Sequence, residues 1–251
     1  MGISERKKRE KEQRRKEILD AAETLFFSHG YDKVSMDAIA DTVELNKATL
    51  YLYFKNKDDL LAGVVLRGIR ILRRKYTECA ETQVPGMTKI ALMGHAYYRF
   101  TREHPDYGPL TKFYSNRDYS EENPCAAEFR KECQTCRMIL RNAIQEGIDD
   151  GTIRNDLNPF LISMYLMVTF QGILSLEDKW KRVIEAEGFS HEDFIREFAR
   201  FITPAIDAQA SKKKPYFLEI KDLDSYGFFG NEPIEIEFPK RKRSIETTKK
   251  K

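Results

Sequence analysis

The chain has 251 residues, of which 41% are hydrophobic, 12% aromatic and 33% charged, and its formal net charge at pH 7 is +3. This length and apolar content suffice for one small and one larger domain, and the charged content favours a soluble protein. No apolar run reaches the roughly 18 residues of a membrane span, and the N-terminus lacks the apolar core of a signal peptide, so we expect a cytoplasmic protein.

The first sixteen residues are basic, with eight Lys or Arg against three Glu. They have no apolar face, which is typical of a frayed helix or a mobile arm. A helix is predicted next, because apolar residues recur at helical spacing at Ile18, Ala22, Leu25 and Phe26. Gly30 would end this helix, since Phe26 and Tyr31 have the spacing of the contact that accompanies a Schellman motif.

Three helix starts follow within residues 35–60. Ser35 is a suitable N-cap for a helix over about residues 36–43, Asn46 for a second helix, and Asn56 for a third that begins at Lys57. Only about three residues separate the first two helices, which is the length of turn in a helix-turn-helix. The second helix is therefore a candidate for insertion into a DNA groove.

The second of these helices has an inner and an outer face. Leu50 and Phe54 are expected to pack inward against the first helix. The outer face and its flanks are formed by Ala48, Thr49, Tyr51, Leu52 and Tyr53. Lys47 in the first turn opposes the helix dipole and so indicates an external anion such as phosphate. A thymine methyl group would cover Leu52; alternatively, Leu52 and the tyrosines belong to a small core.

Residues 18–61, ILDAAETLFFSHGYDKVSMDAIADTVELNKATLYLYFKNKDDLL, resemble the N-terminal DNA-binding domain of TetR-type (TetR/AcrR) transcriptional regulators. The resemblance implies an all-helical dimer whose variable C-terminal domain binds a small molecule and thereby releases DNA. Carried over position by position, the family's DNA contacts fall on Ser35, Lys47, Thr49, Tyr51, Leu52, Tyr53 and Lys57. Ala48, together with Leu52, bears on which operator is read.

The rest of the chain is predicted to be mainly helical up to about residue 211. From Lys57 an uninterrupted apolar pattern predicts a helix to about Cys79, long enough to leave one domain and enter the next. Further helices are predicted over about 87–104, 106–114, 125–148, 160–180 and from 190. We expect the last two to form a four-helix bundle between two subunits. The predicted interface residues are Tyr165, Thr169, Ile173, Phe194, Phe198 and Phe201.

A ligand pocket would lie among the long helices of the second domain. Its predicted lining consists of Met93, Tyr97, Phe100, Phe113, Phe129, Met164, Met167 and Phe170. The polar groups available to it are His95, Arg99 and Gln171. Methionine and aromatic side chains suit an adaptable apolar cavity, which favours a lipophilic or acyl ligand over a sugar phosphate.

Motifs of common enzyme classes do not occur in the sequence. There is no phosphate-binding glycine loop, metalloprotease helix motif or nucleophile elbow, and the four histidines are scattered. We therefore expect no catalysis, cofactor or metal; a helical cytosolic enzyme that retains the DNA-binding motif is the alternative. Cys133 and Cys136 share a helix face and could make a thiol- or metal-responsive regulator, although their apolar neighbours favour core packing.

The predicted organisation has four segments and an all-α fold. They are a basic arm (1–16), a three-helix helix-turn-helix domain (17–62), a helical ligand-binding and dimerisation domain (63–211) and a basic extension (212–251). The extension holds eleven Lys or Arg against seven acids, and we expect it to be disordered or to form two short strands. The predicted function is a transcriptional repressor that binds inverted-repeat double-stranded DNA as a homodimer and is released by a small lipophilic effector.

Overall fold

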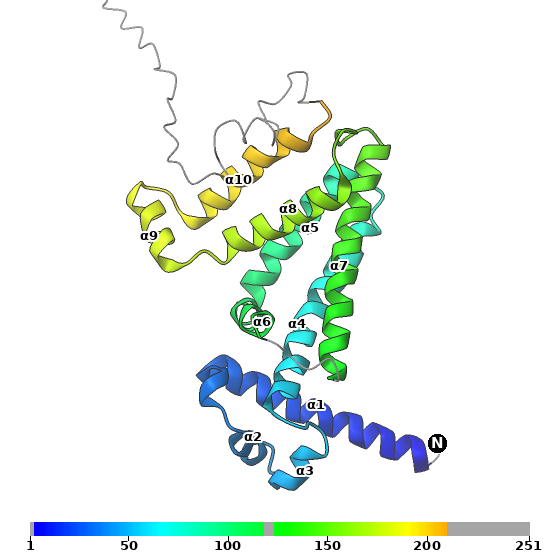
Figure 1. Cartoon of the computed structure of the whole chain (residues 1–251), viewed down its shortest axis with the longest axis vertical. Coiled ribbons are helices and arrows are strands. Elements are labelled where there is room, and N and C mark those ends of the chain that lie inside the picture. Colours follow the sequence, from blue (N-terminus) through cyan, green and yellow to red (C-terminus); the bar gives the residue numbers. More distant parts are fainter. Residues whose placement is uncertain (1–2, 118–122, 210–251) are drawn as a thin grey trace, which may run out of the picture. The chain divides into compact units, whose positions relative to one another are not determined.

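The computed structural model describes residues 3–117 and 123–209, which form helices α1 to α10 and one short 3-10 helix, η1 (Figure 1). Within these residues there is no strand, and the single isolated bridge joins Ile153 and Asp207. The predicted all-α fold class is confirmed. The prediction made for residues 212–251 lies outside the described residues.

The N-terminal head consists of α1 (Ile3–His29), η1 (Tyr31–Lys33), α2 (Met36–Thr42) and α3 (Lys47–Tyr51). Gly30 ends α1 as predicted: its φ is 79°, and its N–H donates to the Phe26 carbonyl at 3.0 Å. The Phe26 and Tyr31 rings lie 5.5 Å apart between centroids, which is the expected contact across this helix end.

The basic arm is not a separate element. Residues 3–16 continue α1 without a break, so the alternative of a mobile arm is wrong (Figure 1). Ion pairs one turn apart support this extension, at 2.8 Å between Arg6 and Glu10 and at 2.9 Å between Lys16 and Asp20. Arg15 is built into the head, because its guanidinium donates to the Tyr53 carbonyl at 3.1 Å and lies 4.1 Å from the Phe54 ring centroid.

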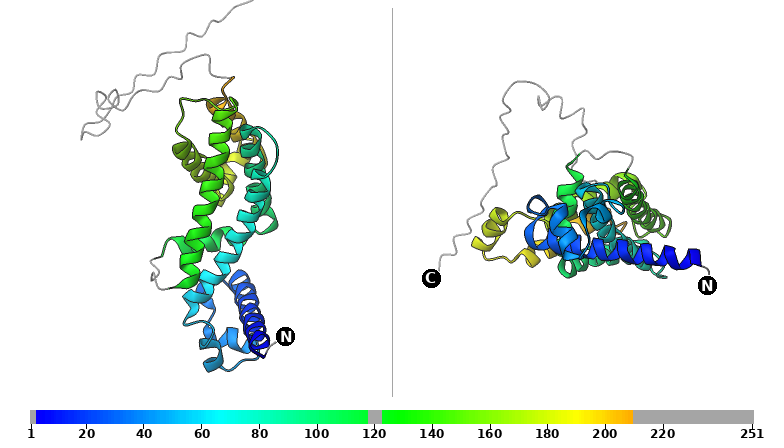
Figure 2. Two further views of the ribbon diagram at one scale, coloured as in Figure 1. Left: turned by 90° about the vertical axis from the view of Figure 1, so that its right-hand side faces the viewer. Right: turned by 90° about the horizontal axis from the view of Figure 1, so that it is seen from below.

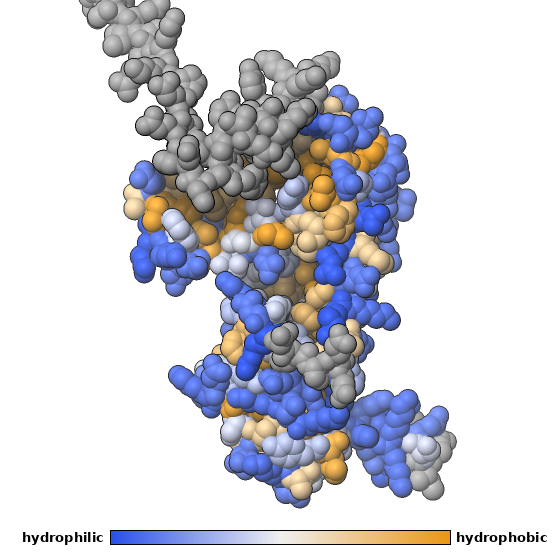
Figure 3. Space-filling model, in the orientation of Figure 1, coloured by the Kyte–Doolittle hydropathy of each residue, from blue (hydrophilic) through white to orange (hydrophobic). Residues whose placement is uncertain are grey.

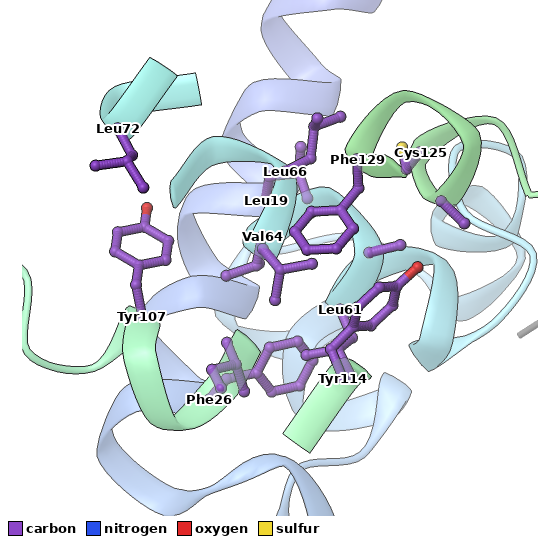
Figure 4. Packing of buried hydrophobic residues seen from close by; sticks show 14 of the residues in the cluster. Leu19, Phe26, Leu61, Val64, Leu66, Leu72, Tyr107, Tyr114, Cys125 and Phe129 are labelled. Carbon is purple, nitrogen blue, oxygen red and sulfur yellow. The ribbon is translucent and has the colours of Figure 1, made fainter. Parts of the chain in front are cut away.

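Helix α4 (Lys57–Ala80) joins the head to the remaining helices. Its N-terminal half is fully buried at Leu60, Leu61 and Val64. Helices α5 (Gly86–Glu103), α6 (Tyr107–Ser115) and α7 (Pro124–Asp149) pack against α4, and α7 lies beside it (Figure 2). One hydrophobic core therefore continues from the head along α4, as the labelled side chains from α1, α4, α6 and α7 show in Figure 4.

The start of α5 crosses the end of α7 at two glycines. A Cβ atom at Gly86 would lie 2.1 Å from the backbone nitrogen of Gly147, so Gly86 does not tolerate a side chain without movement of the helices. The Gly86 N–H donates to Asp150 Oδ2 at 2.7 Å and so holds α5 on the turn after α7. These two helices are thus fixed to each other at one end.

The last three helices are α8 (Pro159–Leu174), α9 (Asp178–Ala186) and α10 (His191–Ile206). The prediction of one helix up to Trp180 was wrong, because α8 and α9 are separate and bent by 78°. Ser175 is the C-cap of α8, and both its backbone N–H, at 3.0 Å, and its hydroxyl, at 2.6 Å, donate to the Gln171 carbonyl. No single described helix is long and apolar enough to cross a bilayer, although the bent pair α8–α9 has sufficient length and apolar content together.

Candidate nucleic-acid interface and helical cavity

Side-chain caps and a tight turn set the angle between α2 and α3. Ser35 Oγ accepts from the Ala38 N–H at 3.0 Å, and Asn46 Oδ1 accepts from the Thr49 N–H at 2.7 Å, so both predicted caps are confirmed. Between the helices, Glu44 has a φ of 53°. The Leu45 N–H donates to the Ala40 carbonyl at 2.9 Å across it, and this bond pattern is a Schellman motif with Glu44 at the left-handed position.

The inner and outer faces of α3 are as predicted. Leu50 is fully buried, and Phe54, which lies beyond the last residue of α3, is buried too. Leu52 is 79% exposed and Tyr51 42% exposed. The alternative that Leu52 belongs to a small core is therefore wrong, and the head presents an apolar side chain to solvent beside the end of α3.

The other residues predicted to contact DNA differ in their exposure and in their contacts within the chain. Ser35 and Ala48 are exposed, whereas Thr49 and Tyr53 are half-buried. Lys47 Nζ lies 2.7 Å from Asp37 Oδ1, and this carboxylate raises the pKa of Lys47. Lys47 in the first turn of α3 therefore has an anionic partner within the chain, Asp37 of α2. The position of Lys47 does not require an external phosphate.

Lys57 is the clear correction to the predicted DNA contacts. Its ammonium donates to the carbonyls of Tyr31 at 3.0 Å and Val34 at 2.9 Å, and it lies 4.0 Å from the centroid of the Tyr31 ring. The side chain therefore ties the start of α4 to η1 and is turned away from solvent. Exposed Lys33 and Lys55, which the sequence reasoning missed, make no ion pair with any described residue and are the better candidates for phosphate contacts.

A cavity of about 680 Å³ opens among α4, α5, α6, α7, α8 and α10, a size typical of small-molecule sites. Six residues of the predicted lining lie on it: Met93, Tyr97, Phe100, Phe129, Met167 and Phe170. The predicted polar residues His95 and Gln171 also line it. Apolar residues of α4 that the sequence reasoning did not assign, including Leu72 and Tyr76, complete one wall.

Several residues predicted for the cavity or for the dimer interface lie outside those sites. Phe113 packs in the head junction, with its ring centroid 5.1 Å from that of Tyr31, and Arg99 pairs with Glu103 at 2.6 Å. The cavity meets α8 at residues 166–171, and Met164 lies before this stretch. Two predicted interface residues also belong inside the chain, because Phe198 lines the cavity and Ile173 is buried.

The head geometry agrees with one known family. Residues 18–64 match a family model described as "Bacterial regulatory proteins, tetR family". The HTH-type transcriptional regulator YhgD of Bacillus subtilis (strain 168) is 25% identical over 162 residues, which cover 62% of this chain and 83% of YhgD. Residues 18–64 are therefore a TetR-type helix-turn-helix domain, and the chain is a DNA-binding transcriptional regulator.

Solved structures of TetR-family proteins share the fold outside the head as well. A TetR/AcrR-family regulator from Thermobifida fusca has a TM-score of 0.62 at 22% identity and covers 80% of this chain and 100% of its own. The regulator FadR from Bacillus subtilis, in complex with stearoyl-CoA, has a TM-score of 0.59 at 19% identity and covers 74% and 96% of the two chains. At these identities the likeness shows the fold.

The TetR-type head and the cavity are joined by polar contacts as well as by α4. Tyr107 of α6 lines the cavity, and its hydroxyl donates to Glu23 Oε1 of α1 at 3.0 Å. Burial, followed by the charge of Glu23, raises the pKa of Tyr107, so this hydroxyl remains a donor. At the N-terminus of α7, Asn123 Nδ2 donates to Asp59 Oδ1 at 2.7 Å, and Arg15 Nη2 contacts Cys125 Sγ at 3.1 Å.

Cys133 and Cys136 both line the cavity as free thiols. Burial raises the pKa of Cys133 to about 11 and that of Cys136 to about 12, so both thiols are protonated at neutral pH. Within the described residues, no three His, Cys, Asp or Glu side chains are grouped to hold a metal ion. The two cysteines are therefore part of the apolar wall in this conformation.

Proposed function

We propose that the chain represses transcription by binding an inverted-repeat operator as a homodimer, and that a small lipophilic effector in the cavity releases the DNA. The observation that carries this proposal is the shared helix α4. Its N-terminal half forms the core of the head, and Leu72 and Tyr76 in its C-terminal half line the cavity. A ligand that displaces these side chains acts on the helix that positions the head.

Dimerisation follows from the size of the recognition element and from the exposed apolar surface. A single five-residue α3 buries too little surface for specific affinity, and two copies in successive major grooves double it. Tyr165 on α8 is 62% exposed and Phe201 on α10 is 78% exposed. A second copy of the chain would cover both side chains in a bundle of two α8 and two α10 helices.

The chemistry of the cavity wall supports a lipophilic effector. Methionine, aromatic and aliphatic side chains make up most of the wall, and they suit flexible apolar ligands. The FadR structure, which shares the fold, was solved with stearoyl-CoA, a ligand with a long acyl chain. Release requires that the ligand bind more tightly to the chain in which the two heads are spaced unsuitably for DNA. The proposal includes no catalytic step and places the protein in the cytoplasm.

Selection of binding sites from random DNA, followed by mobility-shift assays, tests this function. Selected sites should be inverted repeats, and a hydrophobic metabolite extract should abolish the shift. Ala48→Glu, which places a carboxylate on the exposed face of α3, should also abolish it. Ala127→Glu makes the same change at an exposed position of α7 and should retain the shift. Asymmetric sites only, or a shift that no extract alters, would contradict the proposal.

A further inference from the structure

One cation in the cavity wall has no hydrogen-bond or ion-pair partner among the described residues. Cys133, Arg137 and Leu140 follow each other at helical spacing along α7, and all three line the cavity. Arg137 is half-buried between the cysteine and the leucine. Its charge lies close enough to both neighbouring thiols to act on them, since burial raises the pKa of Cys133 and Cys136 and Arg137 partly opposes that shift.

The charged side chains that share the cavity wall with Arg137 already have partners. Arg196, which also lines the cavity, lies 2.8 Å from Asp193. The cavity residue Glu192 accepts from the Tyr98 hydroxyl at 3.2 Å. On the α4 side of α7, Arg73 lies 2.6 Å from Glu132, the acid closest to Arg137 in the sequence. Arg137 makes no hydrogen bond or ion pair with any residue in the ranges 3–117 and 123–209.

An unpaired guanidinium beside an apolar wall gains strongly from an anion. The partly desolvated cation loses hydration without compensation, whereas an oxyanion accepts two parallel N–H bonds from it. The remaining wall offers contacts to an apolar body. We propose that Arg137 binds the headgroup of the effector, and that the effector is an amphiphile with one anionic group, a carboxylate or a phosphate, on an apolar body. This inference rests on the proposed role of the cavity as the effector site.

Direct binding of matched probes to the full chain without DNA tests the inference. Decanoate, decyl phosphate, 1-decanol and decylamine share one alkyl length and differ in headgroup charge and geometry. At least one of the two anions should bind about tenfold or more tightly than decanol, because a charge-assisted hydrogen bond is added to the same apolar contacts. Decylamine should bind more weakly than decanol. The ratio between decanoate and decyl phosphate identifies which oxyanion Arg137 prefers.

Two variants on the same helix assign the effect to one side chain. Arg137→Gln should remove the preference for the anion while leaving the affinity for decanol within about twofold. Arg141→Gln makes the same change one turn later, at an exposed residue outside the cavity wall, and should keep the preference. Thermal unfolding of both variants checks that they fold.

The inference is overturned if the unaltered chain binds decanol as tightly as both anions, which requires no variant. It is also overturned if Arg137→Gln keeps the preference for the anion. Because these titrations contain no DNA, they separate the inference from the proposed function. A chain that prefers anions but never binds an inverted repeat contradicts only the function, and a chain that represses but prefers decanol contradicts only the inference.

Discussion

At the scale of single residues, Leu52 is expected to contribute to recognition of the DNA sequence. Its side chain is 79% exposed in the absence of DNA, so Leu52→Ala should not change the stability of the fold. It should cost about 1 kcal/mol of binding free energy, and only where a thymine methyl group meets it. Titration of operators substituted at each position measures this. Lys55→Ala provides the contrast, because removing an exposed cation that can contact the phosphate backbone weakens binding to every sequence. An unaltered sequence preference in Leu52→Ala would remove Leu52 from the interface.

Glu44 is expected to lower the stability of the fold relative to glycine at the same position. Its φ of 53° is a left-handed conformation in which a Cβ atom is unfavourable, and the Schellman motif prefers glycine there. Relief of this strain in Glu44→Gly exceeds the extra entropy of the unfolded chain, so we expect a gain of about 0.5–1 kcal/mol in the free energy of unfolding. Chemical denaturation measures the gain. Glu187→Gly, at the C-cap of α9 where φ is −88°, should lose stability instead.

Residue roles were predictable where one local rule applies. The N-caps Ser35, Asn46 and Asn56 and the exposed Leu52 follow from helical spacing and capping chemistry alone. The role of Lys57 was not predictable in this way, because the carbonyls that accept from it belong to η1 and the residue that follows it, more than twenty residues earlier in the chain. Contacts between residues far apart in the sequence depend on the tertiary packing of the helices, which local sequence rules do not predict.

At the scale of elements, the N-terminal extension of α1 should contribute affinity without specificity. Figure 3 shows its surface as almost wholly hydrophilic, and Lys7, Lys8 and Lys11 are exposed without an ion pair to any described residue. Glutamine at all three should flatten the dependence of log K on log salt by about 0.9 for each phosphate that the variant no longer neutralises. Binding at several salt concentrations measures this.

The triple substitution is a sharper test than deletion of the extension, because Arg15 packs in the head and must stay. Lys131→Gln removes a positive charge from α7 and serves as the control for net charge. The preferred sequence should be unchanged in both variants. If the salt dependence of the triple variant matched that of the unaltered chain, the three lysines would make no contact with DNA.

The boundaries of α4, α5, α6 and α7 were predictable to within about two residues, because proline, glycine or asparagine marks most of their ends. The break between α8 and α9 was missed because no proline, glycine or asparagine marks it in the sequence. Phe198 and Phe201 of α10 were also assigned from the sequence to the same interface. Phe198 and Phe201 share one helical stripe, yet Phe198 lines the cavity and Phe201 is 78% exposed.

At the scale of the whole molecule, the exposed apolar residues of α8 and α10 should hold two copies together. Tyr165→Glu with Phe201→Glu places two carboxylates in the expected contact, and burying them unpaired is costly. We expect a monomer in sedimentation at micromolar concentration and loss of binding to inverted repeats. Met138→Glu changes a similarly exposed apolar residue on α7 and should remain dimeric. A dimer that persists in the double variant would exclude this surface as the interface.

The crossing of α5 and α7 at Gly86 and Gly147 limits how the molecule can change shape. With no side chain between the two backbones, α7 cannot slide there and is expected to tilt about that end. Its opposite end at Cys125 is roughly 33 Å away at 1.5 Å per residue, so a tilt of about 5° displaces it by roughly 3 Å. Such a displacement exceeds the tolerance of a hydrogen bond, and it falls on the contacts of Asn123 with α4 and of Cys125 with α1.

In this geometry α7 pivots at the crossing, and its displacement increases with distance from the crossing toward the head. Spin labels on exposed residues can follow it, with one label at Thr88 on α5 and the other at Lys131 or Arg141 on α7. On addition of an effector, the distance to Lys131 should change more than twice as much as the distance to Arg141, since Lys131 lies roughly 24 Å from Gly147 and Arg141 roughly 9 Å. Equal changes at both positions would mean that α7 translates instead of tilting.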